Sequence, residues 1–377
     1  MIKLINQLFD PAGYQFWLLI ITIVVGAIAI LSRPFSTYIK FVYPNAKYEA
    51  IGNPYVIQKN LNTIIENKSL SDFKEHINSK RDYNLKGENS YEIQRSLDNC
   101  LYKTIMMMKK DNSKKMQGFY DIFLEKIDMY LIKKELRNKL KNNSVSESSI
   151  EQAILPVTKK LLYNIKEFEK SKLANLLLDY GFHEDIAKEL TQEKIDYLVI
   201  DNAIDKYILN RFLKVKVPYK CDKGKNDFIK IYIDILNIKF LLRCKQLGFD
   251  KNTSMKYYNG EGKEIAPWNY EQLAELTGVG QVISGLEGTS YFNILKNSIE
   301  EYNKEKTVQI LENKLDSFYL KKIKEISTNN YSTIGPSIRY LVFKEFEIQN
   351  LKIIAKAVAE NFSNEITKKL LILEDSL

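Results

Sequence analysis

Two short sequence motifs recur three times along this chain, in the same order and at similar spacing. The first motif runs aliphatic, acid, Asn, any residue, aliphatic; it occurs as LDNCL (97–101), IDNAI (200–204) and LENKL (311–315). The second is IDMYLIKKELRNK (127–139) and IDILNIKFLLRCK (233–245), which share seven of thirteen residues, with a looser copy, FEIQNLKIIAKAV, at 346–358. The acids of the two motifs lie 30, 33 and 35 residues apart in the three copies. We therefore predict one unit of roughly 110 residues, repeated three times.

Helical periodicity dominates the chain after residue 40, so each unit is expected to be all-α. Apolar residues recur at spacings of three and four, whereas the period-two alternation typical of strands is scarce. Stretches rich in Asn, Ser, Gly and charge at 141–149 and 250–264 indicate breaks. We expect three similar helical domains, at residues 41–149, 150–258 and 259–377, preceded by an amino-terminal segment at residues 1–40.

The amino-terminal segment contains an uncharged apolar run at residues 14–31, YQFWLLIITIVVGAIAIL. As a helix its 18 positions would span about 27 Å, close to the thickness of the hydrocarbon core of a bilayer. Tyr14 and Trp17 stand at one end, as interfacial aromatic residues do, and Leu31 closes the other. The run is therefore predicted to be one transmembrane anchor.

The basic residues Arg33, Lys40 and Lys47 follow the apolar run, whereas Lys3 alone precedes it. Because the basic side of a membrane helix stays in the cytoplasm, the large body is expected on the cytoplasmic face of the cell membrane in a single-pass topology. A cleaved signal peptide is an alternative, although its positive charge should precede the apolar run. A buried core helix is another alternative, and the missing polar face weakens it.

Composition excludes several classes of function. The net charge is +9, but no stretch combines dense Lys and Arg with stacking aromatic residues, so nucleic acid is not an expected partner. Three separated cysteines and two isolated histidines offer no disulfide framework and no metal-ligand spacing. No catalytic residues, cofactor or metal site are predicted, because neither a phosphate-binding loop nor an activated nucleophile can be found.

The second motif carries two basic residues one helical turn apart in each copy. These pairs are Lys133 and Arg137, Lys239 and Arg243, and Lys352 and Lys356. Like charges at this spacing repel one another unless an acid lies nearby. One interpretation pairs each with the acid of the preceding motif, Asp98, Asp201 or Glu312, and so ties two helices of the same unit together. The other interpretation is an acidic partner protein that contacts three similar basic faces.

Asp234 and Asn237 lie on a different face of the same motif, among apolar residues. They are expected to form hydrogen bonds within their repeat, because buried polar groups must be satisfied.

Five segments resemble, in order, a known family: the C subunits of archaeal and vacuolar type rotary ATPases, whose vacuolar member is called the d subunit. The segments are FVYPNAKYEAI (41–51), LSDFKEHINSKRDY (70–83), YIDILNIKFLLRCKQLGF (232–249), ISGLEGTSYFNIL (283–295) and YLVFKEFEIQNLKIIAKAV (340–358). The resemblance covers nearly everything from residue 41 to the carboxyl end.

This resemblance implies a non-catalytic, funnel-like socket of three helical domains, present in one copy in the complex. It would belong to the central stalk, sit on the cytoplasmic face of the proteolipid ring and receive the lower end of the central shaft. Rotation would then pass through it between ATP hydrolysis or synthesis elsewhere and proton or sodium transport in the membrane.

The anchor is a departure from the family, whose members are ordinarily soluble. A helix outside a rotating ring would collide with the stationary ion-conducting subunit. We therefore expect residues 14–31 to thread the lumen of the ring, with Gly26, Ala27 and Ala29 as a small-residue face.

Two other functions are weighed against the rotor. The first is a membrane-tethered helical scaffold that binds one acidic partner through its basic faces. The second is an enzyme acting on lipid or nucleotide at the membrane, which the missing nucleophile, base and metal cluster disfavour.

Overall fold

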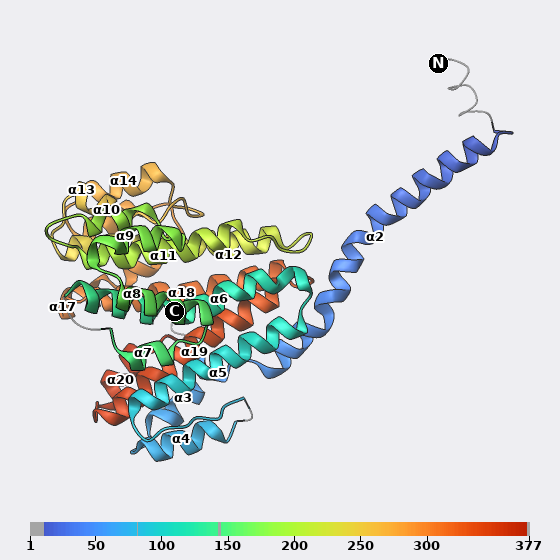
Figure 1. The fold of residues 1–377 in the computed structure, drawn as a ribbon. Helices are drawn as coiled ribbons and strands as arrows, with labels where there is room; N and C mark the ends of the chain where they lie inside the picture. The colour runs from blue at the N-terminus through green and yellow to red at the C-terminus, as the bar shows by residue number, and fades with distance from the viewer. Residues whose placement is uncertain (1–10, 81, 142–144, 375–377) are drawn as a thin grey trace.

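The computed structural model describes residues 11–80, 82–141 and 145–374, and these residues form helices and connecting turns without any strand (Figure 1). The expected all-α class is confirmed. Several helices begin at the capping residues that the sequence supplies: Ser69, Asn89 and Asp250 each accept a hydrogen bond from a backbone N–H of the following turn.

The first described helix, α2 (Tyr14–Ile51), projects away from the body over its amino-terminal half (Figure 1). None of its residues from 14 to 31 is buried, and within the described chain it is the one helix long and apolar enough to cross a membrane. The buried core helix that the sequence left open as an alternative is therefore wrong.

The carboxyl-terminal half of α2 belongs to the body. Phe41, Asn45 and Tyr48 are buried at spacings of four and three, which places them on one face of the helix. The helix therefore continues through residue 40 without a break and ends before Gly52, whose φ of 65° favours glycine. An exposed apolar segment and a docked segment thus share one uninterrupted helix.

Three pairs of long antiparallel helices form the body. They are α5 (Ser90–Asp111) with α6 (Gln117–Leu140), α11 (Tyr197–Lys214) with α12 (Asp222–Gln246), and α18 (Gln309–Asn329) with α19 (Gly335–Ala359). The first sequence motif lies in the first helix of each pair and the second motif in the second helix. The turns within the pairs are short: residues 112–116, with the 3-10 helix η2 (Lys114–Met116), then 215–221 and 330–334.

Shorter helices fill the segments between these pairs. Before the first pair lie η1 (Pro54–Val56), α3 (Gln58–Ile65) and α4 (Leu70–Asn78). Before the second lie α7 (Glu147–Gln152), α8 (Pro156–Glu167), α9 (Lys170–Asp179) and α10 (Glu184–Leu190). Before the third lie α13 (Lys251–Met255), α14 (Pro267–Glu275), α15 (Val279–Gly285), α16 (Phe292–Asn297) and α17 (Ile299–Glu305); α20 (Asn364–Leu370) follows the third.

The three pairs pack in a closed cycle. The first helix of each pair contacts the second helix of the pair before it: α11 packs on α6, α18 on α12, and α5 on α19. The last contact joins the third pair to the first. The second helices are consequently surrounded on several sides, and they bury acids such as Asp128, Asp234 and Glu347 as well as apolar residues.

Candidate functional site

Five of the six predicted basic residues form ion pairs with acids on a neighbouring helix. Lys133 Nζ lies 2.6 Å from Asp205 Oδ1, Lys239 Nζ 2.5 Å from Asp316 Oδ1, and Lys352 Nζ 2.5 Å from Asp98 Oδ1. Arg137 pairs with Asp201, and Arg243 contacts both carboxylate oxygens of Glu312. Lys356 is exposed and has no ion pair within the described part of the chain. The repulsion between the basic residues is thus offset by internal acids.

These ion pairs join different helix pairs, which corrects the interpretation made from the sequence. The acids of the first motif do take part, but Arg137 of the first pair contacts Asp201 of the second, and Arg243 of the second contacts Glu312 of the third. Lys352 of the third pair returns to Asp98 of the first. The physical reason is the packing cycle, which places each second helix beside the next first helix.

We call each place where one helix pair packs against the next a joint. The acids of the second motif also form hydrogen bonds across these joints. Asp128 accepts hydrogen bonds from the backbone N–H groups of Ile154 and Leu155, in the segment that leads into the second pair. Asp234 accepts three backbone N–H bonds from residues 263–265 and one from the Tyr291 hydroxyl.

Glu347 completes this set by binding the amino-terminal part of the body. Its carboxylate accepts from the Tyr83 hydroxyl at 2.7 Å and from Asn53 at 3.2 Å, and Lys344 lies 3.5 Å away. Burial raises the pKa of the Glu347 carboxyl, and Lys344 opposes that rise. Asp234 and Asn237 were expected to bond within their own repeat; they bond to residues 259–265, which directly follow the predicted boundary of that repeat at residue 258.

Three residues at equivalent places in the second helices lie close together. Lys126, Tyr232 and Glu345 each stand directly before the second motif. Lys126 Nζ lies 2.9 Å from Glu345 Oε2 and 5.2 Å from the centre of the Tyr232 ring. The carboxylate of Glu345 raises the pKa of Lys126 although burial opposes the rise. The second helices therefore converge on one another at this level.

Two adjoining cavities flank the central residues. One of about 280 Å³ lies between α6, α11 and α12, and one of about 270 Å³ lies between α12, α18 and α19; both are lined by Lys126, Tyr232 and Leu236. Tyr130 lines the first cavity and is 67% exposed. Gln349, in the equivalent position of α19, lines the second cavity and is exposed too. We call these two adjoining cavities together the axial hollow. Tyr130, Leu236 and Gln349, one from each second helix, border it.

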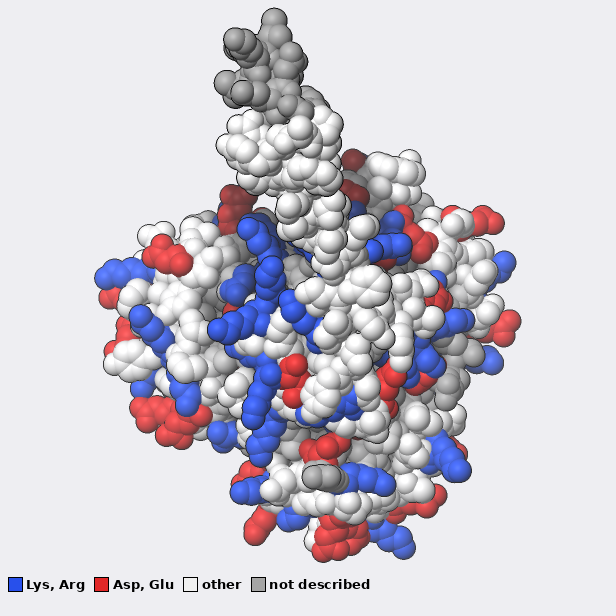
Figure 2. Space-filling model, turned by 90° about the vertical axis from the view of Figure 1, so that its right-hand side faces the viewer, with Lys and Arg blue, Asp and Glu red and all other residues white. Residues whose placement is uncertain are grey.

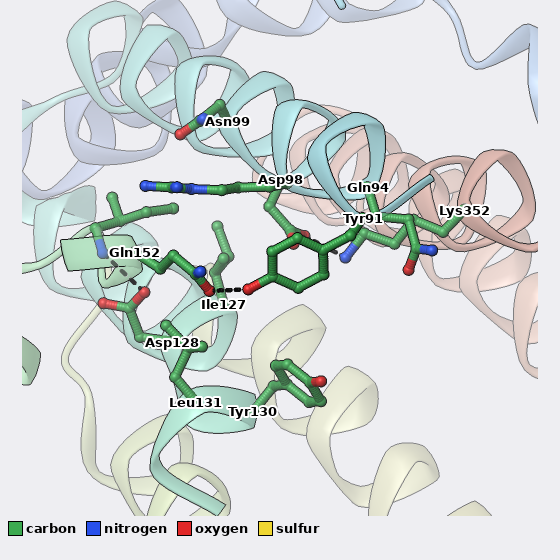
Figure 3. A pocket seen from close by; sticks show the side chains of 12 residues that line it. Tyr91, Gln94, Asp98, Asn99, Ile127, Asp128, Tyr130, Leu131, Gln152 and Lys352 are labelled. Carbon is green, nitrogen blue, oxygen red and sulfur yellow. Dashed lines mark hydrogen bonds and ion pairs between the residues drawn. The ribbon is translucent and has the colours of Figure 1, made fainter. Parts of the chain in front are cut away.

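A third pocket, of about 250 Å³, lies where α19 meets the first helix pair (Figure 3). Two pairs of its polar side chains bond to one another: Lys352 pairs with Asp98, and the Tyr91 hydroxyl donates to Gln152 (Figure 3). Burial raises the pKa of the Asp98 carboxyl, and Lys352 opposes that rise. This pocket marks the joint that closes the cycle of helix pairs.

The residues predicted for the membrane anchor lie along the free part of α2. Tyr14 is 74% exposed, Trp17 56% and Leu31 72%, and Ala27 is exposed as well. A Cβ added at Gly26 would meet nothing within 4 Å. Arg33 lies against the body, with its guanidinium 4.6 Å from the centre of the Tyr219 ring.

Sequence reasoning missed several residues of this site. Asp205 resembles ordinary surface charge in the sequence, and Asp316 belongs to neither motif. Each nevertheless stands four residues after the acid of the first motif, and this shared position could have indicated a shared role. Lys126 and Glu345 differ in residue type at equivalent positions, so similarity between copies could not reveal them.

Comparison with known proteins gives a consistent result. Residues 44–370 match the family described as ATP synthase (C/AC39) subunit. The C subunit of the A-type ATP synthase of Methanocaldococcus jannaschii is 32% identical over 279 residues, covering 72% of this chain and 69% of the relative. Proteins of the same name from Methanobrevibacter smithii and Methanosphaera stadtmanae are 27% and 25% identical, and the alignments cover 94% and 96% of both chains.

The longest of these alignments also bears on the amino-terminal helix. Because it covers 96% of this chain, it includes most of residues 14–31 even if every unaligned residue stands at the amino terminus. Most of the apolar segment therefore lies inside the aligned region. With a fold made only of helices in its described part, and a match over most of its length, the chain belongs to the ATP synthase (C/AC39) subunit family and is a subunit of a rotary ATPase, not an enzyme in its own right.

Proposed function

We propose that this chain is the central-stalk subunit that couples the rotating shaft to the membrane proteolipid ring during proton or sodium transport. The observation that carries the proposal is the axial hollow on a closed cycle of helix pairs. A rotor subunit must hold its shaft by shape and must not yield when twisted. Each of the three joints in the cycle is held by at least one ion pair, so a twist applied to one helix pair is resisted at two joints.

The shaft is proposed to bind at the axial hollow. Tyr130 is an exposed aromatic residue on a cavity wall, which is the kind of residue that contributes most to protein interfaces. Lys126, Tyr232 and Glu345 lie at one level of the hollow. Beyond that level, towards the turns within the helix pairs, the space between α6, α11 and α12 is packed by Phe119, Phe123, Phe212 and Phe228. A shaft would therefore enter from the end opposite to these turns.

The ring is proposed to contact the end from which α2 emerges. Residues 14–31 would cross the membrane once, with the body on the cytoplasmic face and one copy in each complex. Because the body and the ring would turn together, the helix is placed in the lumen of the ring, with Gly26, Ala27 and Ala29 facing the ring helices. Cysteines introduced at these positions should crosslink to inner ring helices; crosslinks to the stationary ion-conducting subunit alone would contradict this placement.

Shaft binding can be tested with Tyr130→Asp in the complex purified from membranes in mild detergent. The matched control is Tyr163→Asp, on α8 at a similar exposure of 55% and away from the hollow. Tyr130→Asp is expected to release the shaft and the catalytic head at least about tenfold more readily than the control, as loss of an interface aromatic does. Equal retention of the head by both variants would contradict binding at the hollow.

The alternative is a membrane-tethered scaffold that binds an acidic protein through the predicted basic faces. The ion pairs argue against it, because five of the six basic residues are already neutralised by acids of the same chain. Purification separates the two functions. Co-elution with a nucleotide-hydrolysing head and a proteolipid ring supports the rotor, whereas elution with a soluble acidic client alone supports the scaffold.

A further inference from the structure

The turn between α11 and α12 lies beside α2 at the level where its apolar run ends. Arg33, two residues after Leu31, places its guanidinium over the ring of Tyr219 in this turn. The turns of the other two helix pairs contact α2 farther along: Asn45 bonds to the backbone oxygens of Tyr331 and Thr333, and Asn112 bonds to Tyr48. Among the three turns, the one at 215–221 thus stands nearest to the apolar segment.

Basic side chains crowd this turn and its flanks. Lys216, Lys220 and Lys223 are all exposed, as are Arg33 and Lys40 on α2. Figure 2, which looks onto the end of the body where α2 emerges, shows Lys and Arg side chains gathered beside and below the base of the helix. Asp222, the first residue of α12, is an exposed acid next to this turn, and it lies 3.9 Å from the largely buried Lys225. We call Arg33, Lys216, Lys220 and Lys223 the basic collar.

Two features of the collar point to a ligand at the polar edge of a membrane. Arg33 follows Leu31 by two residues, which is about 3 Å along the helix. The headgroup layer on each side of the hydrocarbon core is roughly 5–8 Å thick, so Arg33 and the adjacent turn fall within it when residues 14–31 span the core. In addition, Lys220 has a φ of 65°, a left-handed conformation that lysine rarely adopts, and such conformations gather at functional sites.

We propose that the basic collar binds the phosphates of anionic phospholipid headgroups at the cytoplasmic surface next to α2, inside the circle of contacts that the body is proposed to make with the ring. Lysine and arginine side chains next to a membrane helix are attracted to anionic lipid, and the attraction weakens with salt. The collar would fix the depth of α2 and hold lipid against the base of the body. This inference rests on the proposed single-pass anchor, because without it nothing brings the collar to a membrane surface.

The test uses the full chain in lipid nanodiscs. A fluorophore is attached to the cysteine of an Asp222→Cys variant. The dye labels this position selectively because Cys100, Cys221 and Cys244 are buried. The discs hold either zwitterionic lipid alone or one-third anionic lipid, with a trace of lipid that carries a nitroxide quencher on its headgroup. We expect quenching to rise by about twofold or more with anionic lipid, and to fall again at high salt.

Two variants in the labelled chain decide the outcome. Replacing Lys216, Lys220 and Lys223 by Gln should abolish the rise, whereas replacing the exposed Lys159, Lys160 and Lys172 by Gln should leave it intact. Equal quenching in neutral and anionic discs, or an unchanged rise in the first variant, overturns the inference while the anchor stands. The inference is also overturned if the fluorescence changes only when the proteolipid ring is added and not when anionic lipid is present. Failure of the chain to enter discs at all would overturn both the anchor and the collar.

Discussion

Lys239 and Arg243 lie one turn apart on α12 and contact Asp316 and Glu312 on α18. Glu312 is nearly buried, with 4% of its side chain exposed, while Arg243 keeps part of its side chain in water. A buried carboxylate that loses its cation is strongly unfavourable, whereas an exposed cation without a partner costs little. Similar residues in the three copies should therefore differ in their contribution to stability.

Arg243→Met is expected to lower the free energy of unfolding by about 3 kcal/mol, because Glu312 is left buried and uncompensated. Lys356→Met is the control, since Lys356 occupies the same motif position and is exposed. Its effect should stay within about 0.5 kcal/mol. Urea unfolding of the two variants measures the difference, and equal losses would show that the Arg243 ion pair does not stabilise the joint.

Asp316 gives a prediction about pH. Burial raises the pKa of its carboxyl above the ordinary value, and Lys239 only partly opposes the rise. The folded state therefore holds this proton more tightly than the unfolded state, so the contribution of Asp316 to stability is present at low pH. It is lost as pH rises through the folded pKa. Relative to Asp316→Asn, the unmodified chain should lose unfolding free energy as the pH rises above about 4, the ordinary pKa of an aspartate; a gain as the pH rises would contradict the raised pKa.

At the scale of the element, α2 combines two environments in one helix. Its docked half stacks Tyr48 on Tyr340 with ring centres 5.1 Å apart, and Asn112 donates a hydrogen bond to the Tyr48 hydroxyl. The sequence predicted the apolar half because an uncharged run is a strong signal. It did not predict that the helix would continue to Ile51. The few residues of 32–51 that are buried stand among many exposed ones, so they give only a weak helical pattern in the sequence.

Tyr48→Ala should loosen the docked half of α2, because it removes a fully buried ring worth about 3 kcal/mol. Amide hydrogen exchange in residues 41–51 is expected to speed up by about a hundredfold as this half opens locally. Exchange in α12, which lies elsewhere in the body, serves as the internal control. Equal acceleration in both helices would mean global destabilisation and would contradict a local role for Tyr48.

At the scale of the whole molecule, the sequence predicted the helices and the family but not the closure of the cycle. Arg137 is nearer in sequence to Asp98 than to Asp201, so proximity along the chain favoured the wrong partner. Which acid it meets depends on how the helix pairs pack, and a repeated pattern is equally compatible with bonds inside a unit or between units. The axial hollow was also beyond the sequence, since Tyr130, Leu236 and Gln349 share a position but no residue type.

The closed cycle of helix pairs is compatible with the mechanical task proposed for the chain. Lys352 and Asp98 join residues that are far apart in sequence, and Glu347 binds Asn53 and Tyr83 across the same joint. The carboxyl-terminal helix pair is thereby fixed to the beginning of the body. A load applied at the hollow would be carried by all three pairs to α2.

Rotation as one body with the shaft is tested most directly by a covalent crosslink between them. In the assembled complex, Tyr130→Cys is joined by a disulfide to a cysteine on the facing surface of the shaft, and ATP-driven ion transport is measured before and after reduction. If the chain and the shaft turn together, the crosslinked complex transports ions at the same rate as the reduced one. Arrest of transport by this crosslink, with recovery on reduction, would show that the two move relative to each other and would contradict the coupling role.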